Sequence, residues 1–259
     1  MEEKMVSVAN GRFEVQTLEA GTGDDVVFLH GAGGLTWDPF LEALSQKYHV
    51  IAPHLPGTGE STGGEHVFDH HDGFYFYLDF MDAMGLDQVH LIGHSMGGWM
   101  AAEVAAMQPR RFESVTLLSP SGLWSDDYPV LDIWAMLPNE IAEAVFHDVN
   151  HPAAQMMLAV PSDPAELGQL QIQQTKTGSM AAKFMWPIPD KGLKNRIHRI
   201  TSPTLVLWGA SDKLAPVQYA ADFGRLIESS TVEIIKEAGH LPQLEQTEAT
   251  LEKVLAHLG

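Results

Sequence analysis

Residues 91–98, of sequence LIGHSMGG, restrict the fold more than any other stretch of this chain. An apolar run ends at Gly93, Ser95 follows, and two further glycines open a segment with helical spacing. The G-x-S-x-G spacing has a steric cause, because a side chain at either flanking glycine would collide with neighbouring backbone in a tight strand-to-helix turn. We therefore predict that Ser95 stands at the carboxyl end of a buried strand, beside the N–H groups that begin a helix.

Two later segments offer the groups that a serine nucleophile needs. Such a serine requires a base to accept its proton and a third group to hold that base in the correct tautomer. Asp212 and His240 each follow an apolar segment typical of a buried strand. Because loops after parallel strands lie at one sheet edge, Ser95, Asp212 and His240 are predicted to converge. Asp126 and Asp127, which follow the preceding strand, are the alternative acid.

Apolar strand-like segments alternate with amphipathic helical segments along most of the chain. Short connections between them favour right-handed crossovers and parallel pairing. We therefore predict an α/β fold with a mainly parallel, doubly wound sheet of about eight strands. The dipeptide Asn10-Gly11, between two alternating segments near the start, indicates a hairpin at the sheet edge.

The alternation stops between residues 119 and 199, where the sequence offers no strong strand candidate. We predict helices in this part of the chain at 131–137, 138–146 and 164–185. The sequence thus divides into a core of residues 1–120 and 200–259 and a helical insertion of residues 121–199.

Four motifs at predicted strand ends resemble those of the α/β-hydrolase family. They are His30-Gly31, Gly93-His94-Ser95-Met96-Gly97-Gly98, Trp208-Gly209-Ala210-Ser211-Asp212 and Gly239-His240. The resemblance covers the whole chain except the insertion, and it implies that the insertion is a cap domain over the active site. It also implies an oxyanion hole formed by the backbone N–H groups of Ala32 and Met96.

Two residues distinguish this chain from other branches of that family. His54 stands where the loop motif D-x-P-G-x-G-x-S usually has an aspartate, so whatever that carboxylate supports in relatives is not expected here. Ser95 contradicts the branches with an aspartate nucleophile, the haloalkane dehalogenases and epoxide hydrolases. The motifs therefore favour a serine hydrolase that uses no cofactor.

The function that these residues favour is hydrolysis of small to medium hydrophobic carboxylic esters through an acyl-enzyme. A carbon–carbon bond hydrolase of ring-cleavage diketones resembles the same layout, although residues 31–35 lack the proline of its G-x-G-P-G run. A lactonase or a perhydrolase is also compatible with these residues. The alternative from another class is a ligand-binding receptor on the same fold.

Tryptophan and methionine are concentrated in the insertion. Methionine adapts its shape to apolar partners, which suits a roof over a hydrophobic substrate. The residues expected to contact substrate are Trp124, Trp134, Met157, Phe184 and Trp186.

The sequence predicts no metal site. The run 66–72 is rich in histidine and aspartate, but its spacing matches no ligand pattern, and Asp72 is expected to cap the helix that follows. His147 and His151 are four residues apart, yet Pro152 is expected to break the helix that would align them.

The formal net charge of −19 disfavours nucleic acid and anionic membranes as partners, since like charges repel over a Debye length of about 8 to 10 Å. The absence of cysteine excludes disulfides, thiolate metal sites and a cysteine nucleophile. No segment approaches the roughly 20 apolar residues of a membrane span, and the first residues lack the pattern of a signal peptide. We therefore expect a cytoplasmic protein with a small hydrophobic substrate and no nucleic-acid or membrane partner, and we consider a homodimer as its assembly.

Overall fold

The computed structural model describes residues 1–188 and 190–259, and in this part of the chain eight strands form one open sheet. The strands are β1 (Glu2–Val8), β2 (Phe13–Ala20), β3 (Asp25–Leu29), β4 (His49–Pro53), β5 (Val89–His94), β6 (Phe112–Leu118), β7 (Thr204–Gly209) and β8 (Ser230–Ile235). Their order across the sheet is β1-β2-β4-β3-β5-β6-β7-β8, and the neighbours from β4 to β8 are parallel. Only the hairpin of β1 and β2 and its contact with β4 are antiparallel. The predicted fold class is confirmed.

The turn between β1 and β2 is longer than the two-residue turn that Asn10-Gly11 indicates. Val8 lies opposite Phe13, so four residues connect the two strands. Ala9, Asn10 and Gly11 have φ values of 52°, 58° and 82°. The hairpin is therefore present, but three consecutive left-handed residues reverse the chain.

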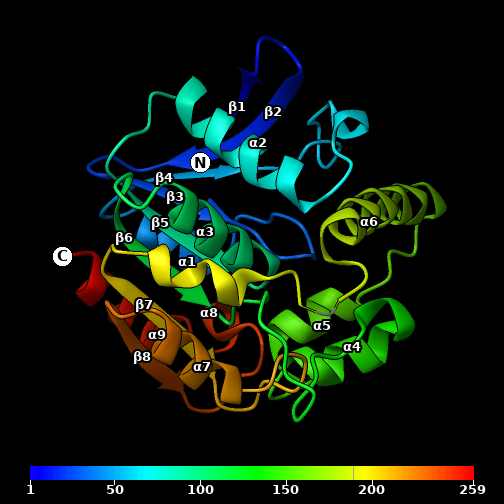
Figure 1. The fold of residues 1–259 in the computed structure, drawn as a ribbon. Coiled ribbons are helices and arrows are strands. Elements are labelled where there is room, and N and C mark those ends of the chain that lie inside the picture. Colours follow the sequence, from blue (N-terminus) through cyan, green and yellow to red (C-terminus); the bar gives the residue numbers. More distant parts are fainter. Residues whose placement is uncertain (189) are drawn as a thin grey trace.

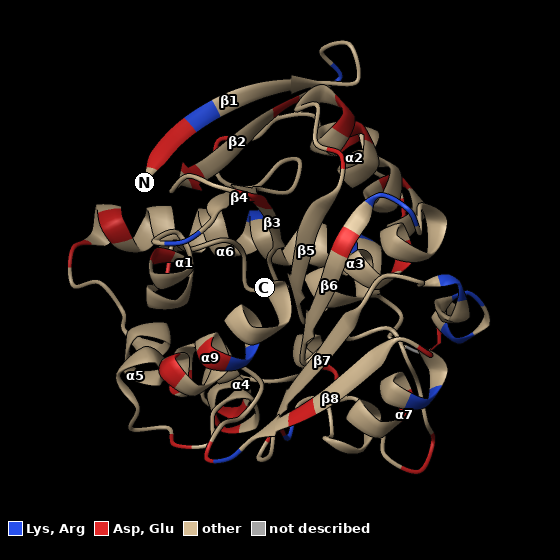
Figure 2. Cartoon of the chain, turned by 90° about the vertical axis from the view of Figure 1, so that its left-hand side faces the viewer, with Lys and Arg blue, Asp and Glu red and all other residues tan. Residues whose placement is uncertain are grey.

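Helices cover both faces of the sheet (Figure 1). The helices of the described residues are α1 (Pro39–Leu44), α2 (His70–Ala83), α3 (Met96–Met107), α4 (Pro138–Val145), α5 (Pro152–Leu158), α6 (Pro164–Met185), α7 (Gln218–Leu226), α8 (Pro242–Glu245) and α9 (Thr247–Leu258), of which α4, α5 and α6 lie in the insertion. The apolar side chains of α2, α3 and α7 join one core cluster, and those of α1 and α9 join the other. Figure 2 shows the sheet between these two helical layers.

Successive side chains of the central strands enter opposite cores. In β3, Val27 and Leu29 belong to the core under α2 and α3, whereas Val26 and Phe28 belong to the core under α1 and α9. A strand buried on both faces favours apolar residues at successive positions, which explains the run of large hydrophobic residues at 26–29. The parallel arrangement places the carboxyl ends of β3 to β8 at one edge of the sheet, where the candidate site lies.

The described residues between β6 and β7 form helices and no strand. α6 matches the predicted range 164–185. α4 begins at Pro138, as predicted, and ends at Val145, one residue before the predicted end at Phe146. The prediction of a helix at 131–137 was wrong, because the only helical structure in this range is one turn of 3-10 helix at Ile133–Ala135. The division into a core of residues 1–120 and 200–259 and a helical cap of residues 121–199 stays a prediction.

No helix of the described residues contains both His147 and His151, as expected, because α4 ends at Val145 and α5 begins only at Pro152. Proline suits this first helical position because it gives up an N–H that has no partner there. The His151 ring accepts the backbone N–H of Ala153 at 3.2 Å and so caps this helix. The start of α2 differs from the expectation. α2 is capped by Asp69, and Asp72 closes the capping box from the third helical position.

Gly97 allows a very close approach between α3 and β3. A Cβ atom there would overlap the carbonyl oxygens of Leu29 and His30, whereas a Cβ at Gly168 in α6 would meet nothing within 4 Å. We expect Gly97→Ala to lower the free energy of unfolding by about 1 to 3 kcal/mol, because the backbone must shift. Gly168→Ala should raise it by about 0.5 to 1 kcal/mol through helix propensity. Urea denaturation of both variants measures these changes, and an unaltered midpoint for Gly97→Ala would contradict the steric argument.

Candidate active site

Ser95 lies on the turn between β5 and α3, with φ 55° and ψ −116°. Glycines on both sides make this turn sterically accessible, since a Cβ on Gly93 would overlap the carbonyl of Gly97. The Ser95 N–H donates to the Leu118 carbonyl at 2.9 Å, which ties the turn to the end of β6. The serine therefore stands at the carboxyl edge of the sheet, immediately before the first turn of α3.

Three side chains that are distant in sequence form a continuous hydrogen-bonded relay. His240 Nε2 lies 2.8 Å from Ser95 Oγ, and His240 Nδ1 lies 2.7 Å from Asp212 Oδ2. Because a carboxylate only accepts hydrogen bonds, Nδ1 carries the imidazole proton and Nε2 offers its lone pair to the serine hydroxyl. The exposed fractions of Ser95, Asp212 and His240 are 6%, 7% and 3%. The relay is therefore shielded from bulk water.

The carboxylate of Asp212 is held at both oxygens. Its Oδ1 accepts the backbone N–H groups of Leu214 and Ala215 at 3.0 and 2.9 Å. Its Oδ2 accepts the indole N–H of Trp208 at 3.0 Å in addition to the histidine. Asp126, considered above as the alternative acid, is exposed and hydrogen-bonds to the indole of its own loop. The structure thus brings Asp212, and not Asp126, to the histidine.

The backbone of His240 is fixed as firmly as its side chain. Its N–H donates to the Val145 carbonyl at 2.7 Å, and its carbonyl accepts from His94 Nε2 at 2.8 Å. A Cβ on Gly31 would lie 2.9 Å from His94 Nδ1, so this ring also packs against the loop after β3. The sequence reasoning singled out neither contact. For His94 the sequence offers one indication of a role at the site, its place inside the G-x-S-x-G motif. Nothing in the sequence indicates the contact of Val145.

The two backbone N–H groups expected to form the oxyanion hole, those of Ala32 and Met96, have no acceptor among the described residues. Ala32 lies in the loop after β3, and Met96 is the first residue of α3. Neither N–H donates a hydrogen bond within the described part of the chain. Free N–H groups at a helix start favour negative charge nearby. His30, in the same loop, donates from Nδ1 to the Gly31 carbonyl at 2.8 Å, and its buried Nε2 has no hydrogen-bond partner within residues 1–188 and 190–259.

Burial keeps two histidines of the site neutral. Loss of hydration, followed by repulsion from the His240 imidazole, lowers the pKa of His94 to about 3. Loss of hydration also lowers the pKa of His30 to about 4. Both rings therefore remain uncharged across the neutral pH range and act only as hydrogen-bonding groups.

These two pKa shifts predict a protein that loses stability in mild acid. Above pH 6.5 both rings are neutral in the folded and the unfolded chain. Between pH 6.5 and about 4 the unfolded chain binds protons that the folded chain does not, so the free energy of unfolding decreases as the pH falls. Each ring contributes about 1.4 kcal/mol per pH unit at most.

Urea denaturation at pH 7.5 and pH 5.0 measures this loss. His94→Gln, which keeps an amide donor but cannot titrate, should reduce the difference between the two pH values by about 2 kcal/mol. The matched control is His71→Gln, because His71 is exposed. An equal pH dependence in the wild type and in His94→Gln would show that His94 does not contribute.

The side chains expected to contact substrate do not form one group. Trp134 and Trp186 pack edge to face, with ring centroids 6.4 Å apart. The Trp124 indole donates to the neighbouring Asp126 carboxylate, and Met157 is exposed on α5. Phe184 is completely buried and lies against Gly73 of α2, so in this structure it packs in the core. A role in substrate contact stays a prediction.

Asp69, His70 and His71 place one ligand atom each within 4.8 Å of one another. The Asp69 carboxylate is already engaged as the cap of α2, where it accepts the N–H groups of His71 and Asp72 at 2.8 and 3.3 Å. The geometry is therefore that of a helix start, and we assign no ion to it.

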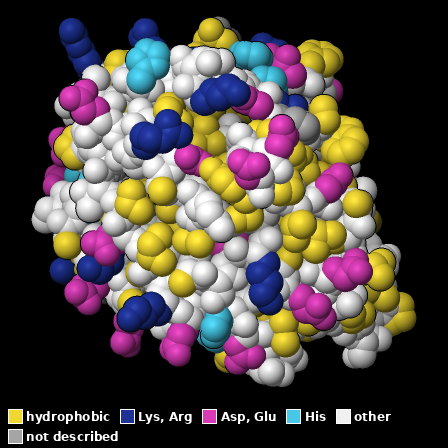
Figure 3. Space-filling view, turned by 60° about the horizontal axis from the view of Figure 1, so that its bottom comes forward, with side chains coloured by type: hydrophobic (Ala, Val, Ile, Leu, Met, Phe, Trp, Pro, Cys, Tyr) yellow, Lys and Arg dark blue, Asp and Glu magenta, His cyan; other side chains and the backbone are white. Residues whose placement is uncertain are grey.

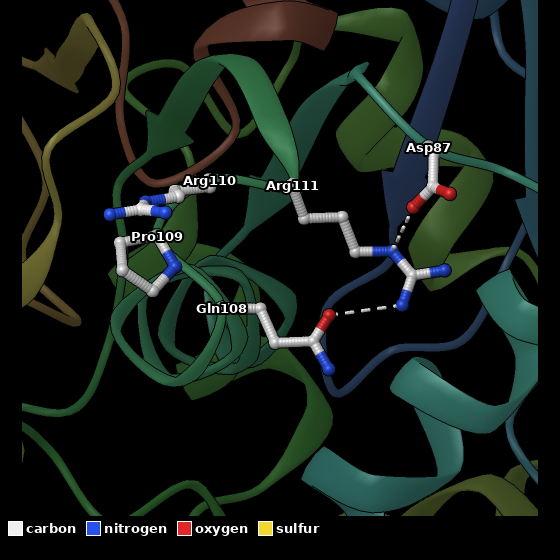
Figure 4. A pocket seen from close by; sticks show the side chains of 5 residues that line it. All are labelled: Asp87, Gln108, Pro109, Arg110 and Arg111. Atoms are coloured by element: carbon white, nitrogen blue, oxygen red, sulfur yellow. Dashed lines mark hydrogen bonds and ion pairs between the residues drawn. The ribbon is translucent and has the colours of Figure 1, made fainter.

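A surface hollow of about 420 Å³ lies at the opposite edge of the sheet from the relay. Figure 4 shows its lining, with Arg111 directed towards Asp87 and Gln108. These residues precede β5 and β6, at the amino ends of the strands. Arg111 Nη1 lies 2.6 Å from an oxygen of Asp82, which largely neutralises its charge. The hollow therefore belongs to the strand-start loops and not to the candidate site.

The comparisons with known proteins identify the fold family. The family model described as alpha/beta hydrolase fold matches residues 25–247. The chain therefore belongs to the α/β-hydrolase fold family. Within the described residues, no helix combines the length and the apolar character that crossing a membrane requires.

Relatives with several activities share this family. The chain is 28% identical over 250 residues to the dihydrolipoyllysine-residue acetyltransferase component of the acetoin cleaving system of Cupriavidus necator, covering 93% of this chain but only 65% of that protein. It is 26% identical over 266 residues to the 2-hydroxy-6-oxo-6-(2'-aminophenyl)hexa-2,4-dienoic acid hydrolase of Metapseudomonas resinovorans, covering 96% of this chain and 88% of that enzyme. A bacterial membrane phospholipase A superposes with a TM-score of 0.81 and 25% identity, over 99% of this chain and 85% of that structure.

Proposed function

We propose that the protein is a serine hydrolase that cleaves small to medium hydrophobic carboxylic esters. The observation that carries the proposal is the relay from Ser95 through His240 to Asp212, with contacts of 2.8 and 2.7 Å. The N–H groups of Ala32 and Met96, which donate to no acceptor in the described part of the chain, would supply the donors that a developing oxyanion needs.

In the first half of the reaction, Ser95 Oγ attacks the ester carbonyl carbon while its proton moves to His240 Nε2. Asp212 stabilises the imidazolium and keeps the Nδ1 proton in place. The carbonyl oxygen becomes an anion that accepts hydrogen bonds from Ala32 and Met96. Collapse of this intermediate breaks the bond to the alcohol, which leaves with the proton from His240. The acyl group remains on Ser95.

In the second half, water replaces the alcohol. His240 Nε2 takes a proton from the water, whose oxygen attacks the acyl carbon. The new oxyanion uses the same two N–H donors, and its collapse returns the proton to Ser95 Oγ. The carboxylic acid is released and the relay is restored. No step requires a metal or an organic cofactor.

An ester is favoured as substrate because tryptophan and methionine are concentrated in the insertion and because a phospholipase superposes over nearly the whole chain. A carbon–carbon bond hydrolase is the second candidate, supported by the dienoic acid hydrolase among the relatives. Against it stands the loop after β3, where residues 31–35 lack a proline. A ligand receptor with the same relay would acylate once and then stop.

A panel of p-nitrophenyl esters from acetate to dodecanoate, assayed beside a ring-cleavage dienone acid, separates these candidates. We expect steady-state ester turnover, and the preferred acyl chain length indicates the size of the acyl-binding site. Faster turnover of the dienone acid would favour the carbon–carbon hydrolase. A stoichiometric burst without steady-state turnover would favour the receptor. A fluorophosphonate should label wild-type protein at Ser95, and its failure to do so would overturn the serine mechanism.

We also propose that the protein acts in the cytoplasm without nucleic acid or an anionic membrane as partner. Acidic residues are distributed over helices and loops around the molecule (Figure 2), consistent with the net charge of −19. On the face that Figure 3 shows, hydrophobic side chains are interspersed with charged ones. Retention on heparin or on anionic vesicles at physiological salt would contradict this proposal.

A further inference from the structure

Glu245, at the end of α8, is a buried carboxylate whose partners are all backbone N–H groups. Its exposed fraction is 8%. Oε1 accepts the N–H groups of His147 and Asp148 at 2.8 and 3.2 Å, and Oε2 accepts the N–H of Gly239 at 2.6 Å. Among the described residues no Lys, Arg or His nitrogen forms an ion pair with it. A buried charge is costly unless it is paired or hydrogen-bonded, and here three N–H donors provide that compensation.

These bonds join two parts of the chain that are far apart in sequence. His147 and Asp148 follow α4 in the insertion, and Gly239 immediately precedes His240. The His240 N–H bonds to the Val145 carbonyl, only two residues before His147. A Cβ on Gly239 would overlap the Val145 carbonyl, so the two segments are in direct backbone contact. The carboxylate of Glu245 accepts hydrogen bonds from both segments at this contact.

We propose that Glu245 is a positioning residue that fixes His240 against the end of α4. The proposal rests on the function assigned above to His240 as the general base. Rotation or displacement of the Gly239 peptide moves the imidazole, and with it the 2.8 Å contact between Nε2 and Ser95 Oγ. A misplacement of about 1 Å at a catalytic group costs roughly 100-fold in rate. The segment that follows α4 therefore helps to hold the His240 imidazole in place through the hydrogen bonds of Glu245.

Glu245→Gln tests this role with a change of one atom. The glutamine has one acceptor oxygen, so it can serve one segment only and must present its NH₂ group to the N–H donors of the other. We expect kcat for a p-nitrophenyl ester to fall about 10- to 100-fold, with KM changed by less than about threefold. The rate of fluorophosphonate labelling of Ser95 should fall by a similar factor. Glu248→Gln is the matched control, because Glu248 is exposed at the start of α9.

A role in stability alone would give a different result. If Glu245→Gln lowers Tm but keeps wild-type kcat and labelling rate at a temperature where it is folded, the positioning role is overturned. If that variant does not fold, Glu245→Asp is measured by the same two rates, since it keeps the charge but is one methylene too short to reach both segments. Normal labelling of wild type combined with unaffected variants refutes this inference alone. Failure of Ser95 labelling in wild type refutes the proposed function itself.

Discussion

Replacement of Ser95 by alanine is expected to lower kcat for the preferred ester by about 10⁶-fold. In the proposed mechanism the Ser95 hydroxyl forms the covalent bond to the acyl group, so its loss removes the acyl-enzyme route. Residual turnover depends on the N–H donors and substrate binding, which the substitution leaves in place. Steady-state kinetics with a p-nitrophenyl ester, together with loss of fluorophosphonate labelling, measures the effect.

The fold of Ser95→Ala should be unchanged, because His240 is the one partner of Ser95 Oγ among the described residues and alanine fits the same turn. Circular dichroism and Tm therefore serve as the control. Retention of more than about one per cent of wild-type turnover in a folded Ser95→Ala sample would be incompatible with Ser95 as nucleophile.

Replacement of Asp212 by asparagine is expected to lower kcat by about 10⁴-fold. Four N–H groups converge on the carboxylate, two at Oδ1 and two at Oδ2. An amide has one acceptor oxygen, so its NH₂ group must face either Leu214 and Ala215 or Trp208 and His240. In the second orientation the amide donates to His240 Nδ1, and the ring then carries its proton on Nε2, where it cannot accept the serine proton.

Asp127→Asn is the matched control for this second experiment, since Asp127 is exposed and follows β6. Its kcat should remain within about twofold of wild type. Fluorophosphonate labelling of both variants distinguishes a less reactive Ser95 from a misfolded site. Ser95 in Asp212→Asn should react slowly but to completion. A larger loss in Asp127→Asn than in Asp212→Asn would reassign the acid to the loop after β6.

The sequence predicted the sheet and the meeting of Ser95, Asp212 and His240 because both follow from parallel topology. Buried strands are recognised by their unbroken apolar runs, and the loops after parallel strands share one edge. The hydrogen bonds among the three side chains fall at that edge. Their catalytic roles stay predictions until the substitutions above are measured.

The insertion was harder to predict because its order depends on tertiary contacts. Residues 131–137 have helical spacing, yet Leu131 donates its N–H to the Leu214 carbonyl and only one turn of 3-10 helix follows. Pro152 has opposite meanings in the middle and at the start of a helix, and local sequence does not separate the two. The hydrogen bond from the His240 N–H to the Val145 carbonyl links residues of two different segments, so no periodicity of the sequence predicts it.

The carbonyls of Ala144 and Val145 accept the N–H groups of Lys213 and His240, which places the end of α4 between the loops that carry the acid and the base. An exchange of insertions between homologous hydrolases would therefore replace part of the catalytic framework if it began at residue 121. A graft that keeps residues 121–148 and replaces only the chain from α5 to the end of α6 leaves these bonds intact. For designers of chimaeras, the useful junction lies about thirty residues inside the insertion rather than at its border with the sheet.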